Sequence, residues 1–258
     1  MSSLPVIFRD DFTDIDLSRW ELYEYSPGTV AITGDGLQII DNQFWHGSLY
    51  RLIERIDAYP LEIEFSYKGW GTDSIWADGF TCVFYKDDNN DVSSYRGLGI
   101  GFGGKGYCVE FDNYYNSHDP TSKSHIALMK DSYTKHLKYT QYAWDDGQWA
   151  NCLISIYPEG GQDRVTVTIN NNEVLSWLGT LDRNYNRFGF SAATGDKRMY
   201  VCLGYVEVRG GEWKPSAGIF PKVDGAWEPS SSFVKVGGSW RPVEAGWVKD
   251  NGVWKPIV

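Results

Sequence analysis

Apolar and polar side chains alternate along much of this chain with a period of two, which is typical of β-strands that bury one face. The alternation is clearest in segments 61–67 (LEIEFSY) and 164–169 (RVTVTI). Two apolar runs of strand length, 80–85 and 152–157, are rich in β-branched and aromatic residues. Segment 49–56 (LYRLIERI) also fits a helical period. We interpret it as a strand because its neighbours are strands.

Turn signals separate these segments. They include Asp35-Gly36, Asp146-Gly147 and Glu159-Gly160-Gly161. Many short strands divided by turns predict an all-β fold, either a sandwich or a barrel. A chain of 258 residues has room for one large β domain and a small appendix.

The C-terminal segment carries a repeat of the form Gly-x-Trp-x-Pro with a period of about 14 residues. The four copies are 211–215, 225–229, 238–242 and 252–256. Three of them begin at a two-residue turn that suits a type I′ hairpin, namely Asp224-Gly225, Gly237-Gly238 and Asn251-Gly252. We therefore predict three successive hairpins, with a main domain over 1–209 and the repeats over 210–258.

Composition and charge exclude some function classes. The net charge of −10 disfavours a nucleic-acid binder, which needs a basic face for phosphates. No apolar run is long enough to span a membrane, and no signal peptide is visible. The four cysteines lie in separate apolar runs, so we expect buried free thiols. Twelve Trp and 17 Tyr would suit stacking on sugars or on a protein partner.

The stretch from Glu110 to His125 is rich in potential metal ligands. Glu110 and Asp112 are two apart on a strand, so their carboxylates share a face. Calcium takes six to eight oxygen ligands. Asp112, Asn116, Asp119 and one backbone carbonyl of the loop can contribute to such a set, while Glu110 and His125 suit a neighbouring transition ion such as manganese. The alternative is a solvated polar loop after a strand.

Three other segments, together with this stretch, resemble the legume-type (L-type) lectins. They are the Ala-Asp-Gly strand at 77–84, the glycine run at 97–104 that leads into Val-Glu-Phe-Asp at 109–112, and the Phe-Gly-Phe-Ser-Ala-Ala-Thr-Gly segment at 188–195. The four motifs occur in the family's order, and the resemblance runs from about residue 8 to residue 208. It implies a concanavalin A-like jelly roll of two large antiparallel sheets.

The resemblance also implies roles for single residues. Asp78 is similar to the aspartate that accepts hydrogen bonds from two sugar hydroxyls, and the peptide bond before that aspartate is cis in the family. Asn116 is similar to the asparagine that binds calcium through its amide oxygen and donates its NH2 group to the sugar. Tyr114 corresponds to the residue that offers its backbone carbonyl to calcium and can stack on the sugar.

Two further parts of the pocket follow from the same resemblance. A backbone N–H of the glycine run completes such sites, and Gly97 and Gly99 straddle that position. Asp196 and Lys197, which follow the Thr-Gly motif, would border the pocket. The resemblance therefore implies a glycan as the ligand, with calcium as the cofactor and manganese or another transition metal beside it.

The metal stretch departs from the family pattern in its spacing. The interval from Asn116 to Asp119 is shorter than usual, that from Asp119 to His125 is one residue longer, and Asn113 stands where threonine is usual. Glu110 and His125 are therefore conditional ligands of a second metal.

An enzyme of the same fold is an alternative. One hydrolase family of this fold carries two glutamates in a Glu-x-Asp-x-x-Glu signature, but this chain has Tyr115 at the last position. We therefore expect a binding protein without catalytic residues, and a glycoside hydrolase with another acid pair stays the second alternative. His46 and His136 are isolated in the sequence, so we expect surface or hydrogen-bonded residues there.

The Trp repeats are similar to those at the ends of bacteriophage tail and adhesion proteins. They suggest a virion or an extracellular, cell-surface location, with host polysaccharides or glycoconjugates as ligands. The repeats themselves would fill small hairpin cores, contact another virion or surface protein, or support a homo-oligomer. The first alternative function is a lectin-fold domain that is structural or binds protein within such an assembly.

Overall fold

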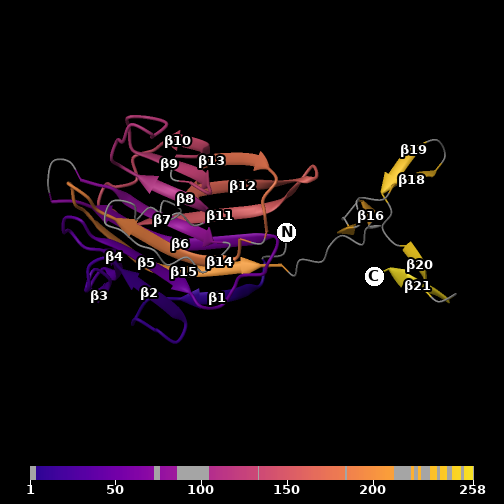
Figure 1. Ribbon diagram of the computed structural model, residues 1–258, viewed down its shortest axis with the longest axis horizontal. Helices are drawn as coiled ribbons and strands as arrows, with labels where there is room; N and C mark the ends of the chain where they lie inside the picture. The colour runs from indigo at the N-terminus through magenta and orange to yellow at the C-terminus, as the bar shows by residue number, and fades with distance from the viewer. Residues whose placement is uncertain are drawn as a thin grey trace. The chain divides into compact units, whose positions relative to one another are not determined.

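The computed structural model is built of β-strands and divides into two compact units, residues 1–211 and residues 212–258. It describes residues 4–72, 76–85, 105–132, 134–183 and 185–211, and the paired strands of the second unit. Figure 1 shows the strands of the first unit as two broad layers. None of these described residues form a helix that is long and apolar enough to cross a membrane.

One layer is an eight-stranded antiparallel sheet in the order β13-β12-β11-β6-β15-β4-β3, with β1 also paired to β15. Its strands are β1 Val6–Asp10, β3 Ala31–Thr33, β4 Gly36–Ile40, β6 Leu61–Trp70, β11 Ala150–Glu159, β12 Gln162–Ile169, β13 Asn172–Gly179 and β15 Tyr200–Gly210. The alternation predicted at 61–67 and 164–169 corresponds to β6 and β12, so those two predictions are confirmed.

The other layer is a seven-stranded antiparallel sheet in the order β10-β9-β8-β7-β14-β5-β2. Its strands are β2 Trp20–Glu24, β5 Gly47–Leu52, β7 Gly79–Tyr85, β8 Gly106–Asp112, β9 His125–Lys130, β10 His136–Gln141 and β14 Arg187–Ala193. The ambiguous segment at 49–56 is a strand as far as Leu52, and the chain leaves the sheet after it. All six residues of β5 are buried, which explains why its sequence does not alternate.

The main hydrophobic core takes residues from both sheets. Phe65 of β6 packs edge-on against Phe80 and Phe111, whose rings stack on each other with centroids 4.4 Å apart. On β8, Val109 and Phe111 belong to this core, whereas Cys108 belongs to a second small apolar cluster on the opposite face of the sheet. That outer face of β8 is also covered, because every residue of the strand is buried.

The four cysteines are free and buried, which confirms the prediction of unpaired thiols. Cys82 and Cys108 lie on β7 and β8, and Cys152 and Cys202 lie on β11 and β15 of the other sheet. Burial raises the pKa of the Cys202 thiol to about 12, and it raises the pKa of the Cys82 thiol further.

The described residues of the second unit form three antiparallel strand pairs. They are β16 Lys222–Val223 with β17 Ala226–Trp227, β18 Phe233–Val236 with β19 Ser239–Pro242, and β20 Gly246–Asp250 with β21 Val253–Ile257. Each pair flanks one of the three turn dipeptides named above, which themselves lie outside the described residues.

Candidate functional site

One end of the seven-stranded sheet gathers the residues singled out in the sequence. Gly79 at the start of β7 pairs with Asp112 at the end of β8, and Asp112 pairs in turn with His125 at the start of β9. Ala193 at the end of β14 pairs with Gly79 from the other side. The sheet register therefore brings segments more than a hundred residues apart to one edge.

Asp78 is held at this edge by its backbone. The peptide bond between Ala77 and Asp78 is cis, as the resemblance implies. The Asp78 N–H donates to the carbonyl of Ala193 at 3.0 Å, and the Asp78 carbonyl accepts from the N–H of Asn113 at 3.1 Å. One carboxylate oxygen of Asp78, Oδ2, is buried and has no hydrogen-bond partner. An unpartnered buried acceptor of this kind is costly unless a ligand completes it.

The loop after β8 is shaped by its own carboxylates. Asp112 Oδ1 accepts the N–H of Tyr114 at 2.7 Å. The Asp119 carboxylate accepts the N–H of Asn116, and the Asp119 N–H donates to the Asn116 carbonyl at 3.1 Å. Trp144, packed against the stacked Phe80 and Phe111 rings, supports the loop by donating its indole N–H to the Asp112 carbonyl at 3.2 Å.

The electrostatics of this edge favour a cation. Burial, followed by the negative charges of Glu110 and Asp119, raises the pKa of Asp112 well above its usual value. Burial also raises the pKa of Asp119. For Asp78, burial and the charges of Asp119 and Asp196 raise the pKa to about 7. A divalent cation bound among these carboxylates would supply the missing positive charge and favour their ionised forms.

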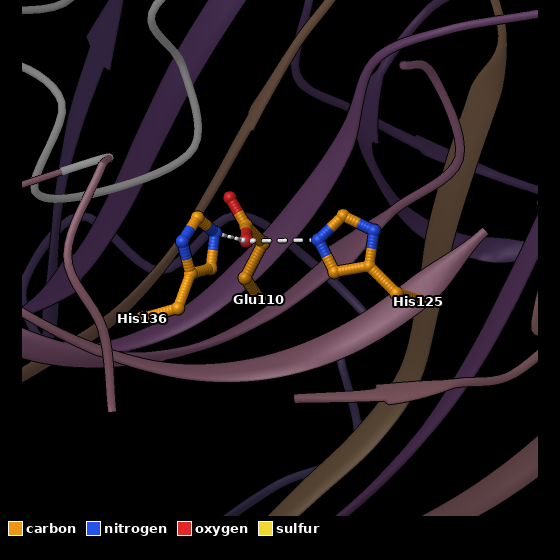
Figure 2. A group of neighbouring side chains, drawn as sticks. All are labelled: Glu110, His125 and His136. Atoms are coloured by element: carbon orange, nitrogen blue, oxygen red, sulfur yellow. Dashed lines mark ion pairs between the residues drawn. The ribbon is translucent and has the colours of Figure 1, made fainter. Parts of the chain in front are cut away.

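Glu110 is the centre of a second cluster, on the face of the sheet that points away from the main core. Its Oε2 atom lies 3.6 Å from Nε2 of His125 and 3.5 Å from Nε2 of His136 (Figure 2). The expectation that His136 is an isolated surface or hydrogen-bonded residue is therefore wrong, because β10 places its side chain against a buried carboxylate. His46, by contrast, is hydrogen-bonded as expected, to Asp41 at 2.6 Å.

The remaining sequence-derived positions are only partly described. Asp196 is exposed, and it is near enough to influence the Asp78 carboxylate. Lys197 is half-buried and accepts the N–H of Gly195 through its carbonyl at 3.2 Å. Gly97 and Gly99 lie outside the described residues.

Solved structures with a similar arrangement of strands share this fold at low sequence identity. Peanut lectin superposes with a TM-score of 0.66 and 16% identity, over 79% of this chain and 96% of the lectin. Lotus tetragonolobus seed lectin superposes with a TM-score of 0.64 and 18% sequence identity, over 79% of this chain and 97% of that lectin. The exoplasmic/lumenal domain of VIP36, in a form bound to Ca²⁺ and Man3GlcNAc, superposes with a TM-score of 0.60 and 16% sequence identity. The match covers 76% of this chain and 87% of the VIP36 domain.

The fold is that of the legume-type lectins. The amino-acid sequence itself matches no protein-family model and no curated protein. The likeness therefore rests on the path of the chain, and it confirms the predicted jelly-roll sandwich.

Within this lectin fold, two residues that support the site were not predicted from the sequence. Trp144 and Asp145 come from the loop before β11, and Asp145 accepts from Trp76 at 2.5 Å and from Asn113 at 3.0 Å. Nothing in the local sequence marks them as part of the edge. His136 was also missed: a regular hairpin of 125–130 with 136–141 does not give its position, because the register shifts between His136 and Lys138 and places His136 opposite Met129.

Proposed function

We propose that the lectin-fold unit binds carbohydrate in a calcium-dependent manner and does not cleave it. The observation that carries this proposal is the Asp78 carboxylate, which is held at the sheet edge with one oxygen buried and unpartnered. A sugar hydroxyl is a donor that such an oxygen can accept. Carbohydrates also present weakly apolar faces, and Tyr114 and Tyr115 lie in the same loop region.

Asp112, Asn116, Asp119 and the Tyr114 carbonyl are the groups proposed to hold calcium. Their oxygen atoms match the hard ligands that calcium prefers. Calcium, when bound, supplies positive charge to the buried carboxylates and fixes the loop before the sugar arrives. Asn116 would then turn its amide NH2 toward the sugar that Asp78 binds, while Gly97 or Gly99 would offer a backbone N–H and Asp196 would border the pocket.

Glycan binding is the direct test. The purified protein is applied to a glycan array with calcium and again with a chelator. Binding is expected only with calcium. Asp78→Asn replaces the acceptor-only carboxylate by a neutral amide, and Asn116→Ala removes an amide from a desolvated site, so each should weaken binding by about 100-fold or more.

Asp14→Asn is the matched control, since Asp14 is exposed and far along the chain from the site residues. It should bind as the unchanged protein does. Calcium-dependent folding without any glycan signal would favour the alternative of a structural or protein-binding domain. Release of reducing ends from an array ligand would instead establish a glycoside hydrolase.

The Trp repeats support a more specific proposal about context. We propose that the protein is a glycan-recognising component of a phage tail or a surface adhesin, with host polysaccharide or glycoconjugate as its ligand. In that setting the repeats would contact another virion or surface protein or a second copy of the chain. Their regular Gly-x-Trp-x-Pro spacing is what supports this proposal.

A further inference from the structure

We propose that His136 is a ligand of a transition-metal ion, together with Glu110 and His125, in a site of two imidazoles and one carboxylate. The resemblance implies a second metal at Glu110 and His125, and the inference adds to it a third ligand, His136, which lies outside that stretch and changes which ion the site prefers. Three neighbouring strands contribute one side chain each: Glu110 from β8, His125 from β9 and His136 from β10.

The three ligand atoms converge on one point. They lie within 4.8 Å of one another, and no other His, Cys, Asp or Glu of the described chain joins the group. An ion with bonds of about 2.1 Å in tetrahedral geometry separates its ligand atoms by roughly 3.4 Å. The distances of 3.5 and 3.6 Å from Glu110 Oε2 to the two imidazole nitrogens are close to this value.

Each of the three atoms also lacks any other partner. Glu110 Oε2, His125 Nε2 and His136 Nε2 are all buried without a hydrogen bond. The side chains themselves are only 4%, 1% and 9% exposed. Three polar atoms that face one another inside a protein without hydrogen bonds are costly unless something bridges them. The three atoms are too far apart to form normal hydrogen bonds with one another, and the space between them can hold an ion.

The orientation of His125 suits a metal ligand. Its Nδ1 atom lies 3.2 Å from the carbonyl of Lys123, so a proton on Nδ1 can be donated there. A neutral ring with its proton on Nδ1 leaves the Nε2 lone pair directed toward Glu110. A backbone carbonyl that fixes the tautomer of the ligating ring is a common support in metal sites.

The donor set favours one class of ion. Imidazole nitrogens suit zinc, copper, iron and nickel, whereas carboxylate and water suit calcium and manganese. The second imidazole from His136 therefore predicts that the site prefers Zn²⁺ or Co²⁺ to Mn²⁺. We expect Zn²⁺ to bind at one ion per chain in addition to calcium.

The experiment uses the full chain, freed of metal by a chelator and then titrated with Zn²⁺, Co²⁺ or Mn²⁺ with calcium present. Ion content is measured by mass spectrometry, and affinity by calorimetry. His136→Gln is expected to weaken Zn²⁺ and Co²⁺ by at least about 10- to 100-fold, the loss that removal of even a supporting group causes. It should also change the visible absorption spectrum of the bound Co²⁺.

His46→Gln is the matched control, because His46 also pairs with a carboxylate, Asp41, but with one only. It should leave ion affinity unchanged. A second measurement needs no variant: the ring nitrogens of all four histidines are followed by NMR as Zn²⁺ is added. Two rings, those of His125 and His136, should change together and show binding through Nε2.

Two results would overturn the proposal. One is unchanged protein that takes up no Zn²⁺ or Co²⁺ under these conditions. The other is His136→Gln protein that binds them with the original affinity and spectrum. Glycan binding is not the readout here, so a failure of the proposed function and a failure of this site are seen separately.

Discussion

Asp163 and Asp112 are both buried carboxylates, and their surroundings shift their pKa values in opposite directions. Asp163 accepts hydrogen bonds from the Tyr59 hydroxyl at 2.6 Å, the Leu181 N–H at 2.8 Å and the Arg183 guanidinium at 2.8 Å. Burial by itself raises the pKa of Asp163, but these donors outweigh it and hold the pKa below its usual value. Asp112 has one backbone donor and other carboxylates around it. The contrast separates a carboxylate that stabilises the fold from one that is proposed to bind calcium.

The lowered pKa of Asp163 has a definite consequence for stability. A carboxylate with a depressed folded-state pKa contributes stability above its unfolded pKa, and this contribution is lost as pH falls through the folded value. Asp163→Asn should reduce the free energy of unfolding by about 2 kcal/mol at neutral pH, with a smaller difference in acid. Urea unfolding at about pH 7 and about pH 3 would check this. Equal differences at both pH values would contradict it.

At the scale of elements, the pairing of β7 with β8 sets the geometry of the candidate site. Gly79 begins β7 with φ +146°, and a Cβ atom there would lie 1.9 Å from the carbonyl oxygen of Phe111. The close approach places Asp78 beside Asn113, just after the end of β8. No side chain can be added at Gly79 without moving one strand from the other.

Gly79→Ala should therefore both destabilise the sandwich and weaken calcium binding. We expect a loss of about 3 kcal/mol or more in the free energy of unfolding, since the substitution combines a strained backbone with a clash against backbone atoms. Chemical denaturation and calcium calorimetry measure the two effects. Gly34→Ala is the control, because nothing lies within 4 Å of the added atom there, and it should change neither.

Whether a strand can be recognised in the sequence depends on whether one or both of its faces are buried. Alternation identifies β6 and β12 because one face of each strand enters the core. It does not identify β5, which is buried on both faces. The position of His136 is harder still, because the pairing of β10 with β9 shifts register between His136 and Lys138. A bulge of this kind has no clear signal in the local sequence.

At the scale of the whole chain, the candidate site could be assembled from the sequence only through the order of four motifs. Asp78, the loop after Asp112 and the segment after Ala193 are distant in the sequence, and only the sheet register joins them. Local patterns report burial of each strand separately, so they do not specify which strands become neighbours. The family resemblance provides that missing information for the candidate site, but not for Trp144 or Asp145.

Removing the repeats tests whether the first unit folds and binds ligands without the second unit. All strands of both large sheets and all described site residues precede Gly211. A chain that ends at Gly211 should therefore unfold cooperatively and bind calcium and glycan with unchanged affinity. Calorimetry and thermal unfolding, compared with the full chain, are the measurements. Loss of glycan binding in a folded truncated chain would show that the repeats contribute to recognition.

The four buried thiols can report local or global unfolding of this protein. Cys82 and Cys108 belong to the sheet that carries the candidate site, and Cys152 and Cys202 belong to the other sheet. A thiol-specific reagent reacts with a buried cysteine only after local or global unfolding exposes it. Peptide mapping of the labelled cysteines would follow the two sheets separately, without any introduced probe. The same chain can thus reveal which sheet opens first, and whether added calcium or zinc slows the opening of either sheet.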